Sequence, residues 1–194
     1  MSTSGDYHHG DLPGATLAAA RELLQTMPAE RISVRELARA AGVSHAAPYR
    51  HFGDRDGFLT ALAGACFEEF LAAQLAAYHA APAGAKLLAV GGAYVDFGVS
   101  NPHAFALVYS ATVTRPGDPS AAVAPLAERH AALLREAVSD ALAAGLLPGP
   151  RDPDDVGAAL WSLAHGLTHL VSNGYLPRAR VTDVLAALLQ PAAG

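Results

Sequence analysis

Apolar side chains recur every three to four residues along most of the chain, the spacing that places them on one face of an α-helix. Ala, Leu and Arg are abundant and alternating β-branched stretches are few, so the chain is predicted to be all-α. Gly and Pro mark loops at 112–119 and 145–153. Helices are predicted at residues 12–27, 34–41, 45–51, 56–80, 83–100, 103–110, 120–144, 154–173 and 181–189.

The most informative segment is 33–52, where a short capped helix is followed by a glycine turn. Ser33 precedes the first helix and Glu36 stands three residues later, which is the arrangement of a capping box. Leu37 and Ala38 are expected to face inward, and the small side chain of Ala38 suits two helices that cross closely. The first helix of this segment is therefore predicted together with its start.

Gly42 stands where this helix must stop and the chain must reverse, a position that favours a residue tolerating positive φ. Val43 is expected to anchor the turn in the core, and Ser44 to cap a second short helix over 45–51. Pro48 would then be the fourth helical residue and would remove one early hydrogen bond. Two short helices around a tight turn are typical of the DNA-binding helix-turn-helix, whose second helix enters the major groove.

Capped helix pairs joined at a glycine also occur in proteins that never contact DNA, so this spacing alone leaves both interpretations open. The end of the second helix favours DNA, because Tyr49, Arg50 and His51 carry donors that suit phosphate contacts. The charge distribution agrees with this interpretation. The whole chain has a net charge of −5, whereas residues 31–55 hold five Arg against one Glu and one Asp.

The stretch ELARAAGVSHAAPYRHFGDRDGFL resembles the N-terminal signature of the TetR (tetracycline-repressor) family of transcriptional regulators. The family pattern Ala-Gly-Val-Ser is matched at 41–44, and Tyr-x-His-Phe is matched at 49–52. Segments 7–12, 101–105 and 161–166 resemble one branch, whose regulatory domain is named for a Trp-His-Gly motif. The resemblance is strong near the N-terminus and thinner over the rest of the chain.

Two positions depart from the family pattern. Pro48 stands where an apolar residue such as Leu is usual, and Arg55 stands where Lys is common. The resemblance implies a three-helix helix-turn-helix DNA-binding domain over residues 1–55, followed by a helical ligand-binding and dimerisation domain over 56–194. It implies a homodimeric repressor that binds a palindromic double-stranded DNA operator and responds to a small, mainly apolar effector.

The motif also indicates which residues contact DNA. His45 and Ala46 are expected at base edges, and Tyr49, His51 and Arg55 at phosphates. The candidate DNA-binding residues are Ser33, Arg35, Ser44, His45, Ala46, Tyr49, Arg50, His51 and Arg55.

Aromatic side chains in the C-terminal part come from several predicted helices. Such residues are core in many helical proteins, whereas the resemblance implies that they surround the effector, with Tyr109 and His165 orienting it. The sequence leaves a pocket and a filled core both open. The candidate ligand-binding residues are Phe70, Tyr94, Phe97, Phe105, Tyr109, Trp161 and His165.

Residues 156–171 contain no Asp, Glu, Lys or Arg and include several Gly and Ala. Such a helix needs cover on more than one side. A second copy of the chain would provide that cover and complete a four-helix interface with the final helix. The final helix is expected to contribute Val184, Leu185, Leu188 and Leu189.

Other chemistry has little support in the sequence. His165 and His169 have a spacing that can bind a metal, but no acidic or Cys partner is nearby in sequence, so no metal or cofactor is expected. The single Cys66 excludes an internal disulfide and is expected to be a buried, inert thiol. No nucleophile motif or paired acid and base stands out, so an enzyme is not expected. The alternatives are a helical metal- or small-molecule-binding enzyme without DNA binding and a helical interaction module that binds neither DNA nor a ligand.

The N-terminus has no apolar segment after a basic start, so no signal peptide is expected. The uncharged stretch 156–177 is interrupted by Ser, His, Asn and Gly and is not expected to span a membrane. A cytoplasmic protein is therefore predicted.

Overall fold

The computed structural model describes residues 12–44, 47–111, 113–115, 118–147 and 151–187. Within these residues the chain forms nine α-helices, two 3-10 turns and one two-residue hairpin, so the predicted all-α class is confirmed. The elements are α1 (Leu12–Leu23), η1 (Ala29–Arg31), α2 (Val34–Ala40), α3 (Ala47–Phe52), α4 (Arg55–Ala80), α5 (Lys86–Ser100), α6 (Pro102–Val108), β1 (Thr114–Arg115), β2 (Asp118–Pro119), α7 (Ala124–Ala143), α8 (Pro153–Ser172), η2 (Arg178–Arg180) and α9 (Val181–Ala187).

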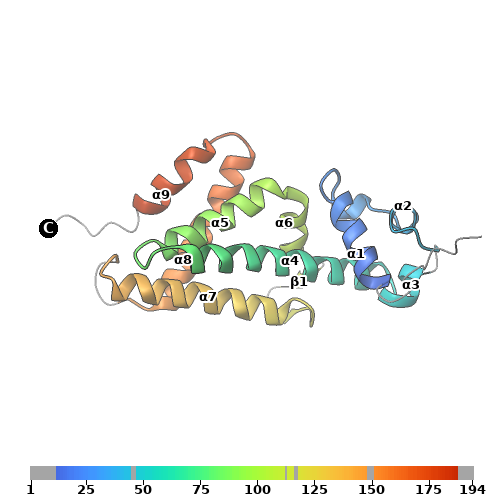
Figure 1. The fold of residues 1–194 in the computed structure, drawn as a ribbon, viewed down its shortest axis with the longest axis horizontal. Coiled ribbons are helices and arrows are strands. Elements are labelled where there is room, and N and C mark those ends of the chain that lie inside the picture. The colour runs from blue at the N-terminus through green and yellow to red at the C-terminus, as the bar shows by residue number, and fades with distance from the viewer. Residues whose placement is uncertain (1–11, 45–46, 112, 116–117, 148–150, 188–194) are drawn as a thin grey trace, which may run out of the picture.

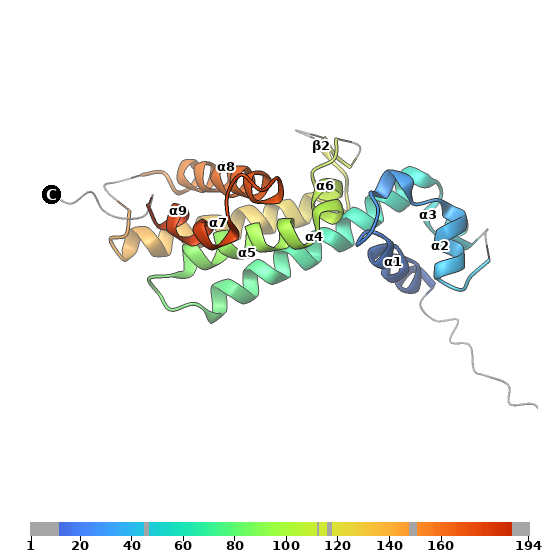
Figure 2. The same cartoon turned by 90° about the horizontal axis from the view of Figure 1, so that it is seen from above.

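The long helix α4 forms the axis of the molecule (Figure 1). Helices α1, α2 and α3 gather at its N-terminal end, and we call these three helices the head; α5 to α9 lie along the remainder (Figures 1 and 2). Asp54 caps α4, because its carboxylate accepts the N–H of Gly57 at 2.8 Å. The head and the C-terminal part therefore share one continuous helix.

By length and apolarity, α4 is also the one helix in the described ranges that could cross a membrane. Its position explains this composition, because 56% of its most apolar 18-residue window is buried inside the protein. Leu62 and Phe70, for example, have no exposed surface at all. A central helix that is packed on several sides needs such apolar residues.

The head is held together by a small core that continues into α4. Leu24, Ile32 and Leu37 are almost fully buried and join the same cluster as Phe58 and Leu62 of α4. Helix α1 packs against α2, α3 and α4. Apolar packing therefore holds the head against α4.

Helix α5 is the centre of the C-terminal part, where it packs against α4, α7 and α8 and also contacts α6 and α9. Gly98 allows this close packing. A Cβ at that position would lie 2.5 Å from Cγ2 of Thr168 in α8 and 3.1 Å from the Phe105 ring in α6. Leu185, predicted at a dimer interface, instead packs on α5 within the same chain, because α9 folds back over that helix. Leu188 and Leu189 lie outside the described residues.

Several helix boundaries differ from the prediction. Helix α1 ends at Leu23 instead of Met27, and the chain continues in a turn in which the N–H groups of Thr26 and Met27 both donate to the Leu23 carbonyl. Helix α7 begins at Ala124 instead of residue 120, because Pro125 fits the first turn of a helix.

Two further segments differ from the prediction. Helix α5 begins at Lys86 instead of residue 83, because the preceding residues form a turn in which the Ala85 N–H donates to the Pro82 carbonyl. The segment 112–119, predicted to be a loop, contains the short hairpin of β1 and β2. This pairing of two residues with two adds no layer to the fold.

Candidate functional site

Helix α2 begins with the predicted capping box. The Ser33 hydroxyl accepts the backbone N–H of Glu36 at 3.1 Å, and the Ser33 N–H donates to the Glu36 carboxylate at 3.2 Å. The hydroxyl of Ser33 also lies 2.7 Å from that carboxylate. Hydrogen bonds from the Ser33 hydroxyl and, to a smaller extent, from the Ser33 backbone N–H lower the pKa of Glu36, because both bonds favour the charged carboxylate. The first turn of α2 is therefore fixed locally.

The turn after α2 reverses as predicted. Gly42 has φ +67°, and the Val43 N–H donates to the Ala38 carbonyl at 2.9 Å. This hydrogen bond spans five residues and is typical of the Schellman motif that ends a helix. Leu37 and Ala38 are fully buried. Their burial confirms the inward face predicted for this helix.

Val43 departs from the prediction, because it is half-buried and is not part of the core. Together with Arg35, Glu36 and Arg39 it borders a hollow of about 380 Å³ beside α2. The short helix α2 already fills the core with Leu37 and Ala38, so the turn residue is left at the edge.

The described part of helix α3 runs from Ala47 to Phe52 and includes Pro48. His45 and Ala46, the proposed base contacts, lie outside the described residues, as does the predicted start of the helix next to Ser44. The backbone of Tyr49 lies within α3, but the placement of its side chain is not described.

The exposed side chains of the head include several cations. Arg35 and Arg39 are exposed on α2, and Arg50 and His51 are exposed in the last turn of α3. His51 also packs its ring edge-on against Phe52, with 4.9 Å between the ring centroids. Guanidinium and imidazole donors on adjacent helices suit a phosphate backbone.

Arg55 has a structural role that the sequence did not indicate. Its guanidinium donates to the backbone carbonyls of Glu30 at 2.7 Å, Ile32 at 3.1 Å and Ala29 at 3.4 Å. These bonds fasten the start of α4 to η1. A phosphate contact by the same guanidinium stays a prediction.

The seven candidate ligand residues come together from α4, α5, α6 and α8, and the Tyr94 hydroxyl is their common polar contact. It donates to the Tyr109 hydroxyl at 3.0 Å, accepts the indole N–H of Trp161 at 3.1 Å and lies 2.8 Å from Nδ1 of His165. Burial raises the pKa of both tyrosines and lowers that of His165. These groups are therefore uncharged near neutral pH.

The apolar members of this cluster form solid core. The Phe70 ring lies 5.0 Å from the Tyr94 ring and 5.2 Å from the Phe97 ring, centroid to centroid, and Phe105 packs edge-on against it at 6.3 Å. Phe70, Phe97, Phe105 and His165 line neither of the two cavities described below, because neighbouring rings fill the space around them.

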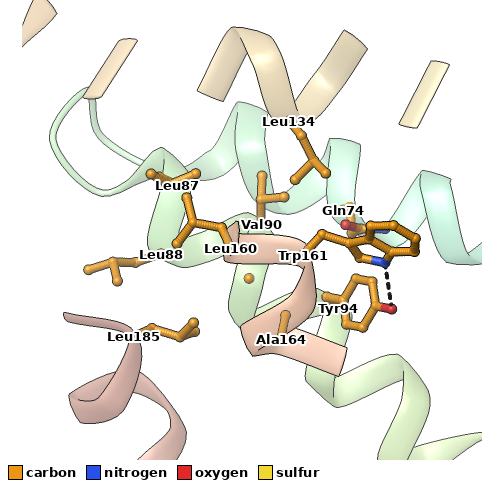
Figure 3. Close-up of a pocket in the computed structure, with 11 residues that line it drawn as sticks. Gln74, Leu87, Leu88, Val90, Tyr94, Leu134, Leu160, Trp161, Ala164 and Leu185 are labelled. Carbon is orange, nitrogen blue, oxygen red and sulfur yellow. Dashed lines mark hydrogen bonds between the residues drawn. The ribbon is translucent and has the colours of Figure 1, made fainter. Parts of the chain in front are cut away.

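A small cavity of about 20 Å³ lies between α4, α5, α7, α8 and α9 (Figure 3). Gln74, Tyr94 and Trp161 are among its walls, and Figure 3 shows the indole of Trp161 directed at the Tyr94 hydroxyl. The side-chain oxygen of Gln74 is buried without a hydrogen-bond partner among the described residues. This volume is sufficient for about one water molecule and no larger ligand.

A second cavity, of about 590 Å³, opens between α7 and α8. We call it the α7–α8 cavity. Its size is typical of small-molecule sites, which measure roughly 300–1,000 Å³. Of the seven candidate residues, Tyr109 and Trp161 line it. Its walls are formed by Phe67, Val108, Tyr109, Ala127, His130, Ala131, Leu134, Arg135, Pro153, Asp154, Gly157, Ala158 and Trp161.

His130 is the main residue of this cavity that the sequence analysis missed. It is 7% exposed, and its Nε2 has no hydrogen-bond partner among the described residues. Burial lowers its pKa to about 4, so the ring is neutral at physiological pH. The available signal was its spacing: Leu126, His130 and Leu133 follow the inward stripe of α7.

Arg135 of α7 and Asp154 of α8 form an ion pair beside the cavity, with Nε 2.7 Å from the carboxylate. Both side chains are more than half exposed. The pair therefore stands at the mouth and joins the two helices there.

The structure also places the histidines considered for a metal site and the single cysteine. Within the described ranges, no group of three or more His, Cys, Asp or Glu could hold a metal ion, although the rings of His165 and His169 pack at 5.2 Å. Cys66 is fully buried, and burial raises the pKa of its thiol to about 11. The thiol is therefore protonated and inert, as the sequence predicted.

A helix-turn-helix head joined to a helical domain with an apolar cavity defines a class of DNA-binding regulators. Residues 17–62 match the family model of bacterial regulatory proteins of the tetR family. Residues 87–192 match the model of the tetracyclin repressor-like C-terminal domain. The chain therefore belongs to the TetR family of transcriptional regulators. The assignment to a branch with a Trp-His-Gly motif stays a prediction.

Solved structures agree with this assignment. A protein of unknown function from Rhodococcus sp. RHA1 is 33% identical over 97% of this chain and 100% of its own, with a TM-score of 0.82. PfmR of Thermus thermophilus, a TetR-family regulator, is 22% identical over 92% of this chain and 98% of its own, with a TM-score of 0.67. FadR of Bacillus subtilis, solved with stearoyl-CoA, is 16% identical over 93% of this chain and 99% of its own, with a TM-score of 0.69. PfmR and FadR have the same fold as this chain. Comparison with curated protein sequences finds no match.

Proposed function

We propose that this protein is a cytoplasmic homodimeric repressor that binds a roughly palindromic operator and is modulated by a small, mainly apolar effector. One observation carries the proposal: the helix-turn-helix head and the α7–α8 cavity share helix α4, which contributes Phe67 to the cavity wall. The proposed division is a DNA-binding domain over residues 1–55 and a ligand-binding and dimerisation domain over 56–194.

In the proposed DNA complex, the start of α3 reads sequence and the surrounding side chains position the head. The exposed donors Arg35, Arg50 and His51 support the positioning role. We assign base contacts to His45 and Ala46. The other proposed contacts, mainly to phosphates, are Ser33, Arg35, Ser44, Tyr49, Arg50, His51 and Arg55.

The effector is proposed to occupy the α7–α8 cavity. Mostly apolar walls and a volume of about 590 Å³ support a small apolar ligand, and Tyr109 and Trp161 would contact it. The fold shared with FadR, whose structure contains stearoyl-CoA, supports a ligand with a large apolar part, such as a stearoyl chain. Phe70, Tyr94, Phe97, Phe105 and His165 would back the cavity wall and hold Tyr109 and Trp161 in place.

Two elements could transmit ligand binding to the head. Helix α4 carries Phe67 of the cavity wall and begins at the head (Figure 1). Helix α6 carries Val108 at the cavity, and the residue before its other end, Asn101, accepts a hydrogen bond from Gln25 at 3.2 Å. Coupling requires different ligand affinities in the DNA-bound and free forms, typically about 1–3 kcal/mol.

The outer face of α8 supports a homodimer. Ala159, Ser162, Gly166 and Leu170 are exposed on it, and none of them carries a charge. Leu170 is 45% exposed and adds a large apolar side chain to this uncharged face. A second copy that covers this face would hold two heads for the two halves of an operator.

The test selects DNA bound by the full chain from a random duplex pool and measures filter binding across salt concentrations. We expect an enriched inverted repeat with half-sites one or more helical turns apart, and affinity that falls steeply with salt. Neither enrichment nor salt-dependent binding is expected of the alternative, an enzyme without DNA binding, and their absence would refute the proposal.

Repeating the selection with metabolite mixtures would find the effector. Tyr109→Ala combined with Trp161→Ala should then abolish the response to that effector at its original concentration. A retained response would place the effector site elsewhere.

A further inference from the structure

Among the described residues, the wall of the α7–α8 cavity holds no unpaired charge. Arg135 and Asp154 are the charged side chains in its wall, and they bind each other at 2.7 Å at the mouth. An ionised group placed inside the cavity, away from the exposed pair at its mouth, would lose its hydration without compensation. An uncharged ligand avoids this penalty.

Most polar groups of the wall are already engaged inside the protein. The Tyr109 hydroxyl and the Trp161 indole N–H both bond to the Tyr94 hydroxyl. His130 differs, because its ring is more than nine-tenths buried and its Nε2 has no partner in the described part of the chain. A buried polar atom without a partner is rare and calls for a bonding group from a ligand or from water.

The position of His130 also restricts the shape of that ligand. The rings of Phe67 and Phe70 hold the imidazole, with centroid distances of 6.1 and 5.5 Å. Phe67, Tyr109, His130 and Trp161 give the wall four ring systems. Such walls favour a flat body that can pack face-on or edge-on against them.

We propose that the α7–α8 cavity selects an uncharged ligand with a flat, mainly apolar body and one hydrogen-bonding group, and that His130 recognises that group. This inference rests on the proposed function, since it takes the cavity to be the effector site. The low pKa of His130, about 4, keeps the ring neutral, so it distinguishes a hydroxyl or carbonyl from hydrocarbon and provides no charge for a carboxylate.

Isothermal titration of the full chain with 1-naphthol, naphthalene and 1-naphthoate at neutral pH tests the inference. The key quantity is the Kd of naphthalene divided by that of 1-naphthol. We expect His130→Phe, which keeps an aromatic ring and removes both nitrogens, to lower this ratio about five- to tenfold, the value of one neutral hydrogen bond. His79→Phe, the same change at an exposed site on α4, should leave the ratio unchanged. Naphthoate should bind most weakly.

Calorimetric melting shows whether each variant is folded. If His130→Phe is not folded, His130→Leu replaces it in the titration. An unchanged ratio would overturn the inference, because water would then satisfy His130. Tightest binding of naphthoate, or no binding of any probe, would overturn it as well. DNA binding by the same samples separates the two proposals: a chain that binds DNA but no probe refutes this inference alone, and a chain that binds no DNA refutes the proposed regulator.

Discussion

The side-chain amide of Gln25 donates to the side-chain carbonyl of Asn101 at 3.2 Å, and this bond links the head to the helix that borders the α7–α8 cavity. Gln25 lies in the turn after α1. Asn101 separates α5 from α6, and it also donates to the Phe97 carbonyl at 3.1 Å. A shift of α6 by a ligand would therefore act directly on the head.

Gln25→Ala is expected to reduce the effector's influence on DNA affinity while leaving the affinity without effector almost unchanged. The lost bond is exposed and contributes about 1 kcal/mol or less to stability. Fluorescence anisotropy of labelled operator, with and without effector, measures both quantities. Thr26→Ala is the control, because the Thr26 hydroxyl bonds locally to the Leu23 carbonyl. A full effector response in Gln25→Ala would exclude this route.

His130 is expected to make stability pH-dependent. Its folded pKa of about 4 lies below the ordinary value of 6.5, so the unfolded chain binds its proton first as pH falls. Stability from this residue is complete above pH 6.5 and is lost as pH falls from there towards 4. The loss by pH 4.5 is about 2.5 kcal/mol. Urea unfolding at pH 7 and pH 4.5 should show a smaller difference for His130→Phe than for the native chain, and equal differences would contradict the buried neutral ring.

Two glycines in α5 are expected to respond oppositely to the same change. Gly98→Ala places a Cβ 2.5 Å from Thr168 and should cost about 1–3 kcal/mol of stability through overpacking. Gly92→Ala meets nothing within 4 Å and should gain up to about 1 kcal/mol from helix propensity. Thermal unfolding of the two variants gives the comparison. Equal melting temperatures would mean that α5 and α8 are not in close contact at Gly98.

Ala159→Glu is expected to convert the proposed dimer to a monomer, because it buries an unpaired carboxylate in the α8 interface. Ala72→Glu is the matched control, since Ala72 is exposed on α4. Light scattering at micromolar concentration distinguishes the two states. A native chain that is already monomeric there would count decisively against the dimer.

Arg55→Ala is expected to weaken DNA binding and also to destabilise the head. Loss of the bonds to the Glu30 and Ile32 carbonyls should cost about 1–2 kcal/mol. Loss of a phosphate contact should lower the salt slope of binding by about one unit. Arg50→Ala, at an exposed site on α3, should lower the slope and leave the melting temperature nearly unchanged.

Filter binding of different DNA sequences across salt concentrations separates the positioning residues from the proposed base contacts. Tyr49→Ala should weaken binding to all sequences similarly, whereas His45→Ala should change which sequences are preferred. Intact affinity in Tyr49→Ala, together with an intact salt slope in Arg55→Ala, would remove both phosphate assignments.

Sequence reasoning succeeded where the structure depends on neighbouring residues. The capping box of Ser33 and Glu36 and the turn at Gly42 involve bonds between residues three to five apart, and the structure contains both. The start of α7 was predicted at residue 120 instead of Ala124, although Pro125 marks that start locally. Caps, proline and glycine act within about one turn, so their pattern is sufficient to predict them.

Residues distant in sequence were predicted less well. The cavity admits Tyr109 and Trp161 but leaves Phe70 in solid core, and this division depends on how four helices pack. Arg55 was predicted from its charge, but the carbonyls that it binds lie 23 to 26 residues earlier in the chain. Residue type gave the correct neighbourhood in both cases, and the direction of the side chain came from the packing.

The sequence alone determined an all-helical chain with a helix-turn-helix near its N-terminus, because helix periodicity and capping are local properties. Only the tertiary structure decided that His130 lies unpartnered at a cavity and that Leu185 packs within its own chain. The physical reason is that burial and hydrogen bonding of a side chain depend on the elements that close around it. Those elements are brought together by contacts between residues far apart along the chain.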